Sequence, residues 1–403
     1  MAVIASVAAR VINDSRGQPT IEVTVTDDKG RIATASLPSG SSLGKYEAVT
    51  QDAQQVVNSI NKVIAPALLR QPLTDQATID AKLRSFDDTA NHEKLGVNSL
   101  LGISLACARL LAQDHNLSLY HYIFTISGGP GLTIPTPMFN LLNGGKHAEN
   151  NLDFQEYMVI PIGFKTFHEK LAAGKKVFSA LGTILSETGH ITKIGAEGGY
   201  APHLSTNEEG LGVLVQAIQS AGYEPGKDFV LGVDVAASAL PPTYSATVDN
   251  YLALYRNFPL FSLEDPFVED DWESWAKLKV GVDGLSEPGN PRLLVGDDLF
   301  VGNKDRLLEG VKKFSANAVL IKINQAGTLT EIIEAIKIAR EHNYVHILSH
   351  RSGETLDSFV SDLAIGTAAA FIKAGSANEQ APERIVKYER LVEVEEELNI
   401  GHI

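Results

Sequence analysis

The sequence predicts an α/β fold in which a (β/α)8 barrel follows an N-terminal α+β domain. The first observation is a rhythm in the second half of the chain. There, short apolar runs end in a charged residue about every 30 residues, the length of a strand–helix–strand unit. The second is the amphipathic helical pattern between such runs, which is clearest over 329–343. The third is an alternation of apolar and polar residues near the N-terminus, typical of antiparallel strands.

The N-terminal domain is expected to span residues 1–133 and to begin with a small sheet. The segments 7–13 and 20–38 alternate apolar and polar residues, and a turn at Asp28-Lys29-Gly30 divides the second segment. A Gly- and Ser-rich loop, residues 39–44, follows the last of these strands. This serine loop could close over a site as a mobile lid, or simply connect two elements.

Helical patterns fill the rest of this domain. Apolar residues recur at helical spacing in three segments, which are 53–69, 76–86 and 98–113. Pro66 and Pro72 are expected to bound the first of these helices. The segment 126–137 is rich in Gly and Pro, so we interpret it as the linker to the second domain.

The second domain is expected to span residues 134–403 and to form the barrel. A doubly wound sheet is the alternative, but its site would lie at one switch point rather than along a series of charged strand ends. The sequence has no GxGxxG after a strand and no GxxxxGK[ST], so nucleotide binding has no support.

Composition limits the classes of function. The formal net charge of −15 and the lack of a basic stripe argue against nucleic acid as a partner. Cys107 is the single cysteine, so an intramolecular disulfide is impossible, which is compatible with a reducing compartment. The start of the chain lacks the pattern of a secretory signal, and no apolar stretch is long enough to span a membrane. We therefore expect a cytoplasmic enzyme.

Three carboxylates are the strongest candidates for site chemistry. Asp234, Glu264 and Asp297 each end an apolar run. In a barrel the C-terminal ends of the strands meet at one face, where the active site is built. Three hard oxygen ligands at that face favour a divalent cation such as Mg²⁺. Each carboxylate could instead cap the helix that follows it, but three in register favour the ligand interpretation.

The series of charged strand ends continues with Lys322, His350 and Lys373. Desolvation and a nearby cation would lower the pKa of Lys322, so it could act as a general base near neutral pH. The alternative is a lysine that extends to the rim of the barrel. Its place in the series favours the base, and the whole set suggests metal-assisted proton abstraction.

Other candidates come from loops. Arg351 and Ser352 follow a strand and could bind a phosphate or carboxylate, or form a salt bridge on a surface loop. Glu197 lies in a Gly-rich turn that could deliver an acid to a substrate, or could simply be solvated. His147 and Glu156 are either site groups or polar residues at the edge of the core.

Taken in order, these motifs resemble those of the enolase family over almost the whole chain. The matching segments are 14–20, 37–40, 143–147, 155–156, 197–199, 262–267, 297–299, 322–325 and 349–355. The resemblance implies a modified TIM-like (β/α)8 barrel, whose early strands depart from simple βα alternation, together with an N-terminal α+β domain. It also implies a homodimer or homo-octamer, with the N-terminal strands as the expected contact region.

The activity implied by the resemblance is the reversible dehydration of 2-phosphoglycerate to phosphoenolpyruvate. Asp234, Glu264 and Asp297 would hold one Mg²⁺, and Ser39 would help to hold a second when its loop closes. Lys322 would take the C2 proton, and Glu197 would assist departure of the C3 hydroxyl. The remaining residues would bind the substrate: Arg351 and Ser352 at the phosphate, with His147, Glu156, His350 and Lys373 completing the site.

The chain departs from the family pattern at several positions. Ala196 stands where enolases usually have Asp, Leu43 where the serine loop usually has Thr, and Ala239 where Glu is common. The stretch 241–255 is shorter than usual, and the run 375–384 differs from the usual Ser/Arg-containing pattern. These departures keep two alternatives open. One is a dehydratase or racemase for another acid, and the other is a weakly catalytic or non-catalytic binding protein.

Overall fold

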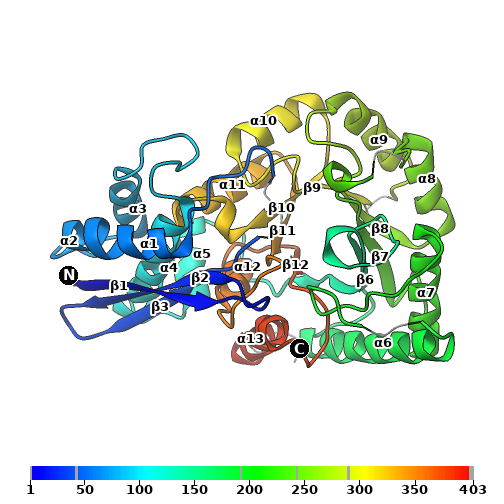
Figure 1. The fold of residues 1–403 in the computed structure, drawn as a ribbon, viewed down its shortest axis with the longest axis horizontal. Helices are drawn as coiled ribbons and strands as arrows, with labels where there is room; N and C mark the ends of the chain where they lie inside the picture. The colour runs from blue at the N-terminus through cyan, green and yellow to red at the C-terminus, as the bar shows by residue number, and fades with distance from the viewer. Residues whose placement is uncertain (1, 41–43, 191–192, 242–243, 288–290, 399–403) are drawn as a thin grey trace.

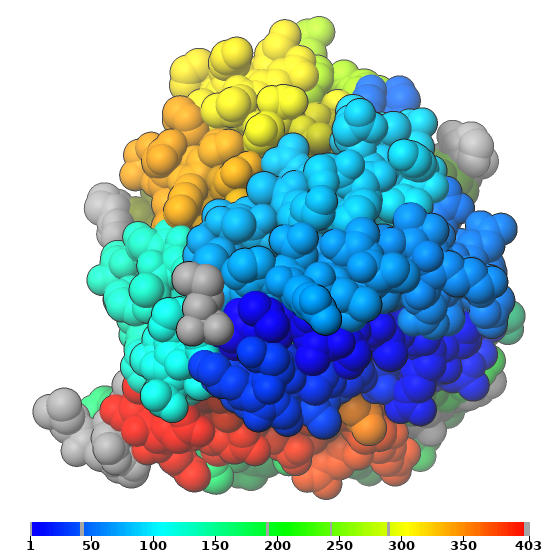
Figure 2. All heavy atoms as spheres, turned by 90° about the vertical axis from the view of Figure 1, so that its left-hand side faces the viewer, coloured from blue at the N-terminus to red at the C-terminus, as the bar shows by residue number. Residues whose placement is uncertain are grey.

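The computed structural model describes residues 2–40, 44–190, 193–241, 244–287 and 291–398, so Leu43 lies outside the described residues. A small antiparallel sheet with helices α1 to α5 forms one side of the molecule, and a barrel with its outer helices forms the other (Figure 1). Figure 2 looks onto the N-terminal side, where the first elements are packed directly against the later part of the chain.

The predicted antiparallel strands are confirmed. They are β1 (Ile4–Asn13), β2 (Pro19–Asp27) and β3 (Ile32–Ser36), paired in that order. The apolar face of β2 is buried against α4 (Val97–Asp114). Gly102 makes this contact possible, because a Cβ there would lie 2.5 Å from a methyl carbon of Val23. The sheet therefore packs closely on a central helix of the same domain.

The three predicted helical segments also form, with two corrections. The first is continuous from α1 (Ala53–Ser59) through a π-helical turn (Ile60–Ile64) to α2 (Ala65–Leu68). Pro66 therefore lies inside the helix instead of bounding it. The π turn, in which the Ala65 N–H donates to the Ile60 carbonyl, shifts the hydrogen bonds directly before the proline.

The second correction concerns the linker. Helix α5 (Leu119–Ser127) follows α3 (Gln76–Arg84) and α4, and it was not expected from the sequence. Its aromatic and β-branched residues have weak helix propensity, and burial of Tyr120, Tyr122 and Ile123 stabilises it instead. The first two residues of the predicted linker 126–137 belong to this helix, and the last two belong to a strand. The segment between the two elements is therefore shorter than predicted.

The barrel is a nearly closed mixed sheet. Its strand order is β4-β12-β11-β10-β9-β8-β7-β6-β5. Only Met138 separates β4 from β5, which stand at opposite ends of this order, so the chain itself joins the two edges. The strands are β4 (Thr136–Pro137), β5 (Phe139–Asn143), β6 (Glu156–Pro161), β7 (Phe229–Asp234), β8 (Leu260–Glu264), β9 (Leu293–Gly296), β10 (Ala318–Lys322), β11 (Val345–Ser349) and β12 (Phe371–Lys373).

The early strands depart from βα alternation. Strand β6 runs antiparallel to both β5 and β7, whereas the pairs from β7 to β12 are parallel. Two helices, α6 (Phe167–Glu187) and α7 (Asn207–Ser220), precede β7, and single helices alternate with the later strands. These are α8 (Val248–Asn257), α9 (Trp272–Gly284), α10 (Lys304–Lys313), α11 (Leu329–Glu341), α12 (Phe359–Gly366) and α13 (Pro382–Leu398). The modified TIM-like barrel is therefore confirmed.

Apolar residues cover both faces of the barrel strands. One buried cluster fills the interior and includes Met138, Met158, Leu293 and Leu320, and a larger one lies between the strands and the helices. This explains the continuous apolar runs of the sequence. In the part of the chain that the structure describes, no helix has the length and apolar character needed to cross a membrane.

A buried histidine on β11 makes stability depend on pH. Burial lowers the pKa of His346 to about 4, against about 6.5 in an unfolded chain. The unfolded chain therefore binds this proton more readily, and the free energy of unfolding should fall between about pH 6.5 and pH 4. The full loss is about 3 kcal/mol.

Urea unfolding of the wild type and His346→Asn at pH 7, 5 and 4 measures this contribution. The variant should lose less stability on acidification than the wild type. His342→Asn, which replaces an exposed histidine nearby, is the matched control and should keep the wild-type profile. Equal pH profiles for His346→Asn and the wild type would contradict the prediction.

Candidate active site

Charged residues gather where the parallel barrel strands end. β7, β8, β10 and β12 end at Asp234, Glu264, Lys322 and Lys373, and Asp297 and His350 directly follow β9 and β11. Glu156 reaches the same edge from the first residue of the antiparallel strand β6, where it is paired with Asp234. The carboxylates of β6, β7 and β8 therefore stand on adjacent strands.

A buried lysine holds this carboxylate cluster together. Lys373 Nζ lies 2.9 and 2.8 Å from the two carboxylate oxygens of Glu264, 2.9 Å from Glu156 Oε2 and 3.8 Å from Asp234 Oδ2. Burial alone would lower the pKa of Lys373, but Glu156 and Glu264 outweigh it and raise that pKa well above its usual range. Burial raises the pKa of Asp234 and Glu264, although Lys373 lowers both.

Asp297 belongs to a second, adjoining group. It forms an ion pair with Lys322 and accepts a hydrogen bond of 3.2 Å from Gln325 Nε2. The carboxylate of Asp265 accepts the main-chain N–H groups of Asp297 and Asp298 at 3.1 and 2.7 Å. Asp265 has a positive φ of 41°, so the backbone is turned sharply after β8 to reach this position.

Three groups of described residues could hold a cation: one is His147, Glu156 and Glu197, and the other two consist of carboxylates alone and overlap. One is Asp234, Glu264 and Asp265, and the other is Asp265, Asp297 and Asp298. Asp265 joins them, which the strand-end rule does not predict because Asp265 lies one residue beyond the strand. Its position in the sequence, directly after Glu264, predicts a group that supports or caps the ligands, and the structure places it in both sets. The buried, all-oxygen donor set fits a hard divalent cation.

The expectation that a nearby cation lowers the pKa of Lys322 stays a prediction, because the charged side chain that contacts Lys322 here is the carboxylate of Asp297. Burial lowers that pKa, but the carboxylate of Asp297 raises it by more. Lys322 in turn helps to hold the pKa of Asp297 below its usual value, against the opposing effect of burial. The ion pair between Asp297, directly after β9, and Lys322, at the end of β10, was not visible in the sequence.

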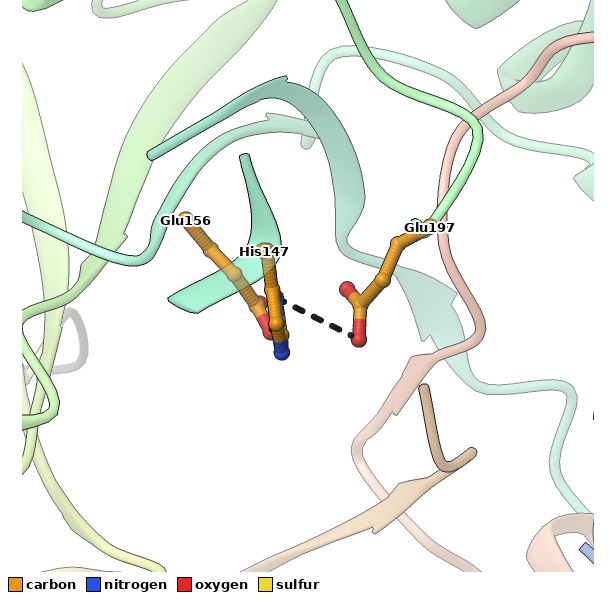
Figure 3. A group of neighbouring side chains, drawn as sticks. All are labelled: His147, Glu156 and Glu197. Atoms are coloured by element: carbon orange, nitrogen blue, oxygen red, sulfur yellow. Dashed lines mark ion pairs between the residues drawn. The ribbon is translucent and has the colours of Figure 1, made fainter. Parts of the chain in front are cut away.

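On the other side of Glu156, His147 lies between two carboxylates (Figure 3). His147 Nδ1 is 3.7 Å from Glu156 Oε1 and 3.6 Å from Glu197 Oε1. Burial raises the pKa of Glu156 well above its usual range, and Glu197 adds to that shift. Burial would also raise the pKa of Glu197, but His350 and His147 lower it well below its usual range. The two carboxyl groups are thus driven toward different protonation states.

An arginine missed by sequence reasoning fixes His350. Arg384 is fully buried at the start of α13, and its Nη1 lies 2.6 Å from His350 Nδ1. A guanidinium can only donate, so Nδ1 is the acceptor and the ring hydrogen is on Nε2. That Nε2 lies 3.3 Å from Glu197 Oε2. Burial lowers the pKa of His350 to about 4, so the ring is neutral near pH 7. No local pattern in the sequence predicts that Arg384 is buried. Arginines are ordinarily exposed, so a surface position was the default expectation.

Arg351 and Ser352 lie at the rim of the same site. Arg351 is buried, forms an ion pair with Glu47 and donates a hydrogen bond of 2.9 Å to Asn324 Oδ1. Ser352 Oγ accepts a hydrogen bond of 3.2 Å from Arg16 Nη1. The N-terminal domain therefore contributes charged contacts to this rim.

The first part of the serine loop is tied to the segment that carries Arg351. Ser39 and Gly353 exchange two main-chain hydrogen bonds of 2.7 and 2.9 Å. The hydroxyl of Ser39 donates to Asp14 Oδ2 at 2.5 Å and accepts from Arg16 Nη2 at 2.8 Å. Ser39 thus contacts other residues than the barrel carboxylates, and it is the one predicted metal ligand that the structure does not bring near them.

Nine of the predicted residues share one pocket. Its walls are formed by His147, Gln155, Glu156, Glu197, Asp234, Lys322, Ser349, His350, Arg351, Ser352 and Lys373. Glu264 and Asp297 contact the wall residues Lys373 and Lys322. The cavity volume is about 20 Å³, which is room for a water molecule or an ion. An organic substrate therefore requires side chains or the serine loop to move apart.

The departures from the family pattern differ in their relation to this pocket. Ala196 directly precedes the pocket residue Glu197. Ala239 ends a short 3₁₀ helix after β7 and does not line the pocket. The shortened stretch 241–255 includes the start of α8.

Comparison with known families agrees with this architecture. The family model described as Enolase, N-terminal domain matches residues 4–123. The one described as Enolase, C-terminal TIM barrel domain matches residues 131–242 and 239–402. Such domains indicate an enzyme of the lyase type with enolase-superfamily function, and the buried carboxylates could hold metal ions. The chain belongs to the enolase family.

Proposed function

We propose that this chain catalyses the Mg²⁺-dependent, reversible dehydration of 2-phosphoglycerate to phosphoenolpyruvate in glycolysis and gluconeogenesis. The observation that carries the proposal is the combination of groups in one pocket. A strand-end lysine, a loop carboxylate and an arginine–serine pair line it, and buried carboxylates lie beside it. A phosphorylated hydroxy acid needs each of these groups: a base for C2, an acid for C3 and donors for the phosphate.

Lys322 is the proposed base for the C2 proton. To accept a proton it must first lose its own, and its ion pair with Asp297 opposes that loss. Two Mg²⁺ ions, one held by Asp234, Glu264 and Asp297 and one with help from Ser39, would supply positive charge that stabilises the dianion formed at the substrate carboxylate. Asp297 would then be shared between a Mg²⁺ ion and Lys322, and its ion pair with the Lys322 ammonium would weaken.

Glu197 is the proposed group that assists departure of the C3 hydroxyl. It needs a proton for this task, although its own pKa is low. Glu156, whose pKa is raised, is the neighbouring carboxyl group that retains a proton more readily. His147 lies between the two and contacts both, so it could pass a proton from one to the other. His350 and Lys373 complete the walls against which the substrate would be held.

Arg351 and Ser352 are the proposed phosphate ligands. Glu47 occupies the Arg351 guanidinium, so a phosphate would compete with that carboxylate. Gly40 lies so close to Arg351 that a Cβ there would be 1.9 Å from its Nη2. Phosphate binding and displacement of the serine loop are therefore expected to be coupled.

We also propose that the domain boundary lies between residues 133 and 134, which is compatible with family matches that end at 123 and resume at 131.

We further propose a cytoplasmic homodimer or homo-octamer with the N-terminal strands at its contact region. Size-exclusion chromatography with light scattering tests the oligomer, and a monomer would exclude it.

The first test is formation of phosphoenolpyruvate from 2-phosphoglycerate, followed by ultraviolet absorbance with Mg²⁺ and with chelator. Turnover that requires Mg²⁺ is the expected result.

Lys322→Ala should lower turnover by about 100-fold or more and abolish deuterium exchange at C2, because the base is lost. Mg²⁺ binding should persist. Lys312→Ala, which removes an exposed lysine of α10, is the control and should behave as the wild type. Retained exchange in Lys322→Ala would rule out this base. Turnover of a non-phosphorylated sugar acid alone would replace the proposed substrate.

A second prediction concerns charge compensation. Lys373→Met removes the ammonium from Glu156, Glu264 and Asp234, which leaves buried carboxylates without their partner. The free energy of unfolding in chelator at pH 7 should fall by about 3 kcal/mol or more. Mg²⁺ should raise the melting temperature of this variant by more than that of the wild type. Lys277→Met breaks an exposed ion pair on α9 and serves as the control. Wild-type stability of Lys373→Met in chelator would contradict the prediction.

A further inference from the structure

The loop that carries Glu197 is held through its main chain by the segment that follows Lys373. Three consecutive carbonyls of the loop each accept one hydrogen bond from that segment. The donors are Arg384 Nη2 to Ala196 at 3.1 Å, the Ser376 N–H to Glu197 at 3.1 Å, and Asn378 Nδ2 to Gly198 at 3.2 Å. We call this set of three bonds the carbonyl clamp.

The two segments approach so closely that glycines are required on both sides. Gly198 has a φ of +84°, and a Cβ there would lie 2.6 Å from Ser376 Oγ and 3.1 Å from the Ala381 side chain. Gly375 has a φ of +88°, and a Cβ there would lie 2.7 Å from the Glu197 carbonyl oxygen. The loop therefore takes part in this contact through its main chain, and the identity of the side chain at position 196 has little part in it.

The donors of the clamp are themselves fixed. Asn378 is buried, its N–H donates to Ser376 Oγ at 3.2 Å, and its Oδ1 accepts from the Gln380 N–H at 2.9 Å. The Asn378 amide is thereby oriented with its NH₂ group toward Gly198. Arg384 also donates to the carbonyls of Arg351 and Ser352 at 2.7 and 2.6 Å. One guanidinium thus connects the Glu197 loop to the segment proposed to bind phosphate.

We propose that Asn378 and Arg384 are positioning residues for Glu197, and that they act by holding its loop through the carbonyl clamp. The inference rests on the proposed function only for the reaction in which Glu197 takes part. Alanine at position 196 then does not impair the site, because the loop is fixed by the main-chain carbonyls of residue 196 and of the two residues after it.

Asn378→Ala and Asn378→Asp test the clamp. Both remove the donor to Gly198, and Asp keeps the acceptor for the Gln380 N–H and nearly the same shape. Gln380→Ala is the matched control, since it removes an exposed side chain of the same segment and leaves the main chain intact. Hydrogen–deuterium exchange of a peptide covering residues 194–200 should rise in both Asn378 variants and stay at the wild-type level in Gln380→Ala.

Kinetics separate positioning of Glu197 from a general loss of structure. Both Asn378 variants should lower kcat for phosphoenolpyruvate formation by roughly tenfold to 100-fold. KM and the rate of C2 deuterium exchange, which depends on Lys322, should stay within about twofold of the wild type. Equal losses of C2 exchange and of dehydration would overturn the assignment to Glu197, as would unchanged kcat in both variants.

Two further variants complete the test. Ala196→Asp should change turnover by less than about twofold, because the clamp already fixes the loop, and a tenfold gain would show that the clamp alone does not position Glu197. Arg384→Lys retains the charge and loses the fork of donors, so exchange of residues 194–200 should rise as in Asn378→Ala. If the wild type does not turn over 2-phosphoglycerate, the proposed function fails. The exchange experiment still decides whether the clamp exists.

Discussion

The buried ion pairs of Lys373 are the interaction on which this end of the barrel depends. Glu156, Asp234 and Glu264 lie on adjacent strands, where water cannot solvate them, so each raises the cost of ionising the others. One ammonium cannot neutralise three carboxylates, and Lys322 is engaged by Asp297. The remaining negative charge destabilises the folded chain and is also what would attract divalent cations. The same imbalance thus links stability to the proposed metal site.

The antiparallel strand β6 explains how one pocket gathers residues of such different origin. In a fully parallel barrel, each strand presents its last residue to the catalytic face. Because β6 runs the other way, its first residue, Glu156, comes to that face, and the loop before it brings His147. The loop that carries Glu197 connects the two helices, α6 and α7, that follow β6. The irregular start of the barrel therefore supplies the side of the site with the proposed acid, and the regular part supplies the proposed base and metal ligands.

Sequence reasoning succeeded where one local rule applied and failed where a contact was tertiary. The strand-end rule located Asp234, Glu264 and Lys373, since an apolar run and its final charge are adjacent in sequence. It did not predict the ion pair between Lys322 and Asp297, which raises the pKa of Lys322, because that contact depends on the distance between two strands. Arg384 was overlooked as an organising residue for the same reason. Helix α5 was missed because burial, and not propensity, stabilises it.

The departures at Ala196 and in the run 375–384 are far apart in sequence, yet they meet in space. Asn378 and Gly198 are 180 positions apart and share a hydrogen bond, and Ala381 lies beside Gly198. When each departure is judged alone, Ala196 is a missing carboxylate and the run 375–384 is a degraded motif. When they are considered together, both belong to one contact in which three consecutive main-chain carbonyls of the loop accept hydrogen bonds. The proposed role of Glu197 requires its loop to be held in place, and the three hydrogen bonds to the loop carbonyls do so without a carboxylate at position 196.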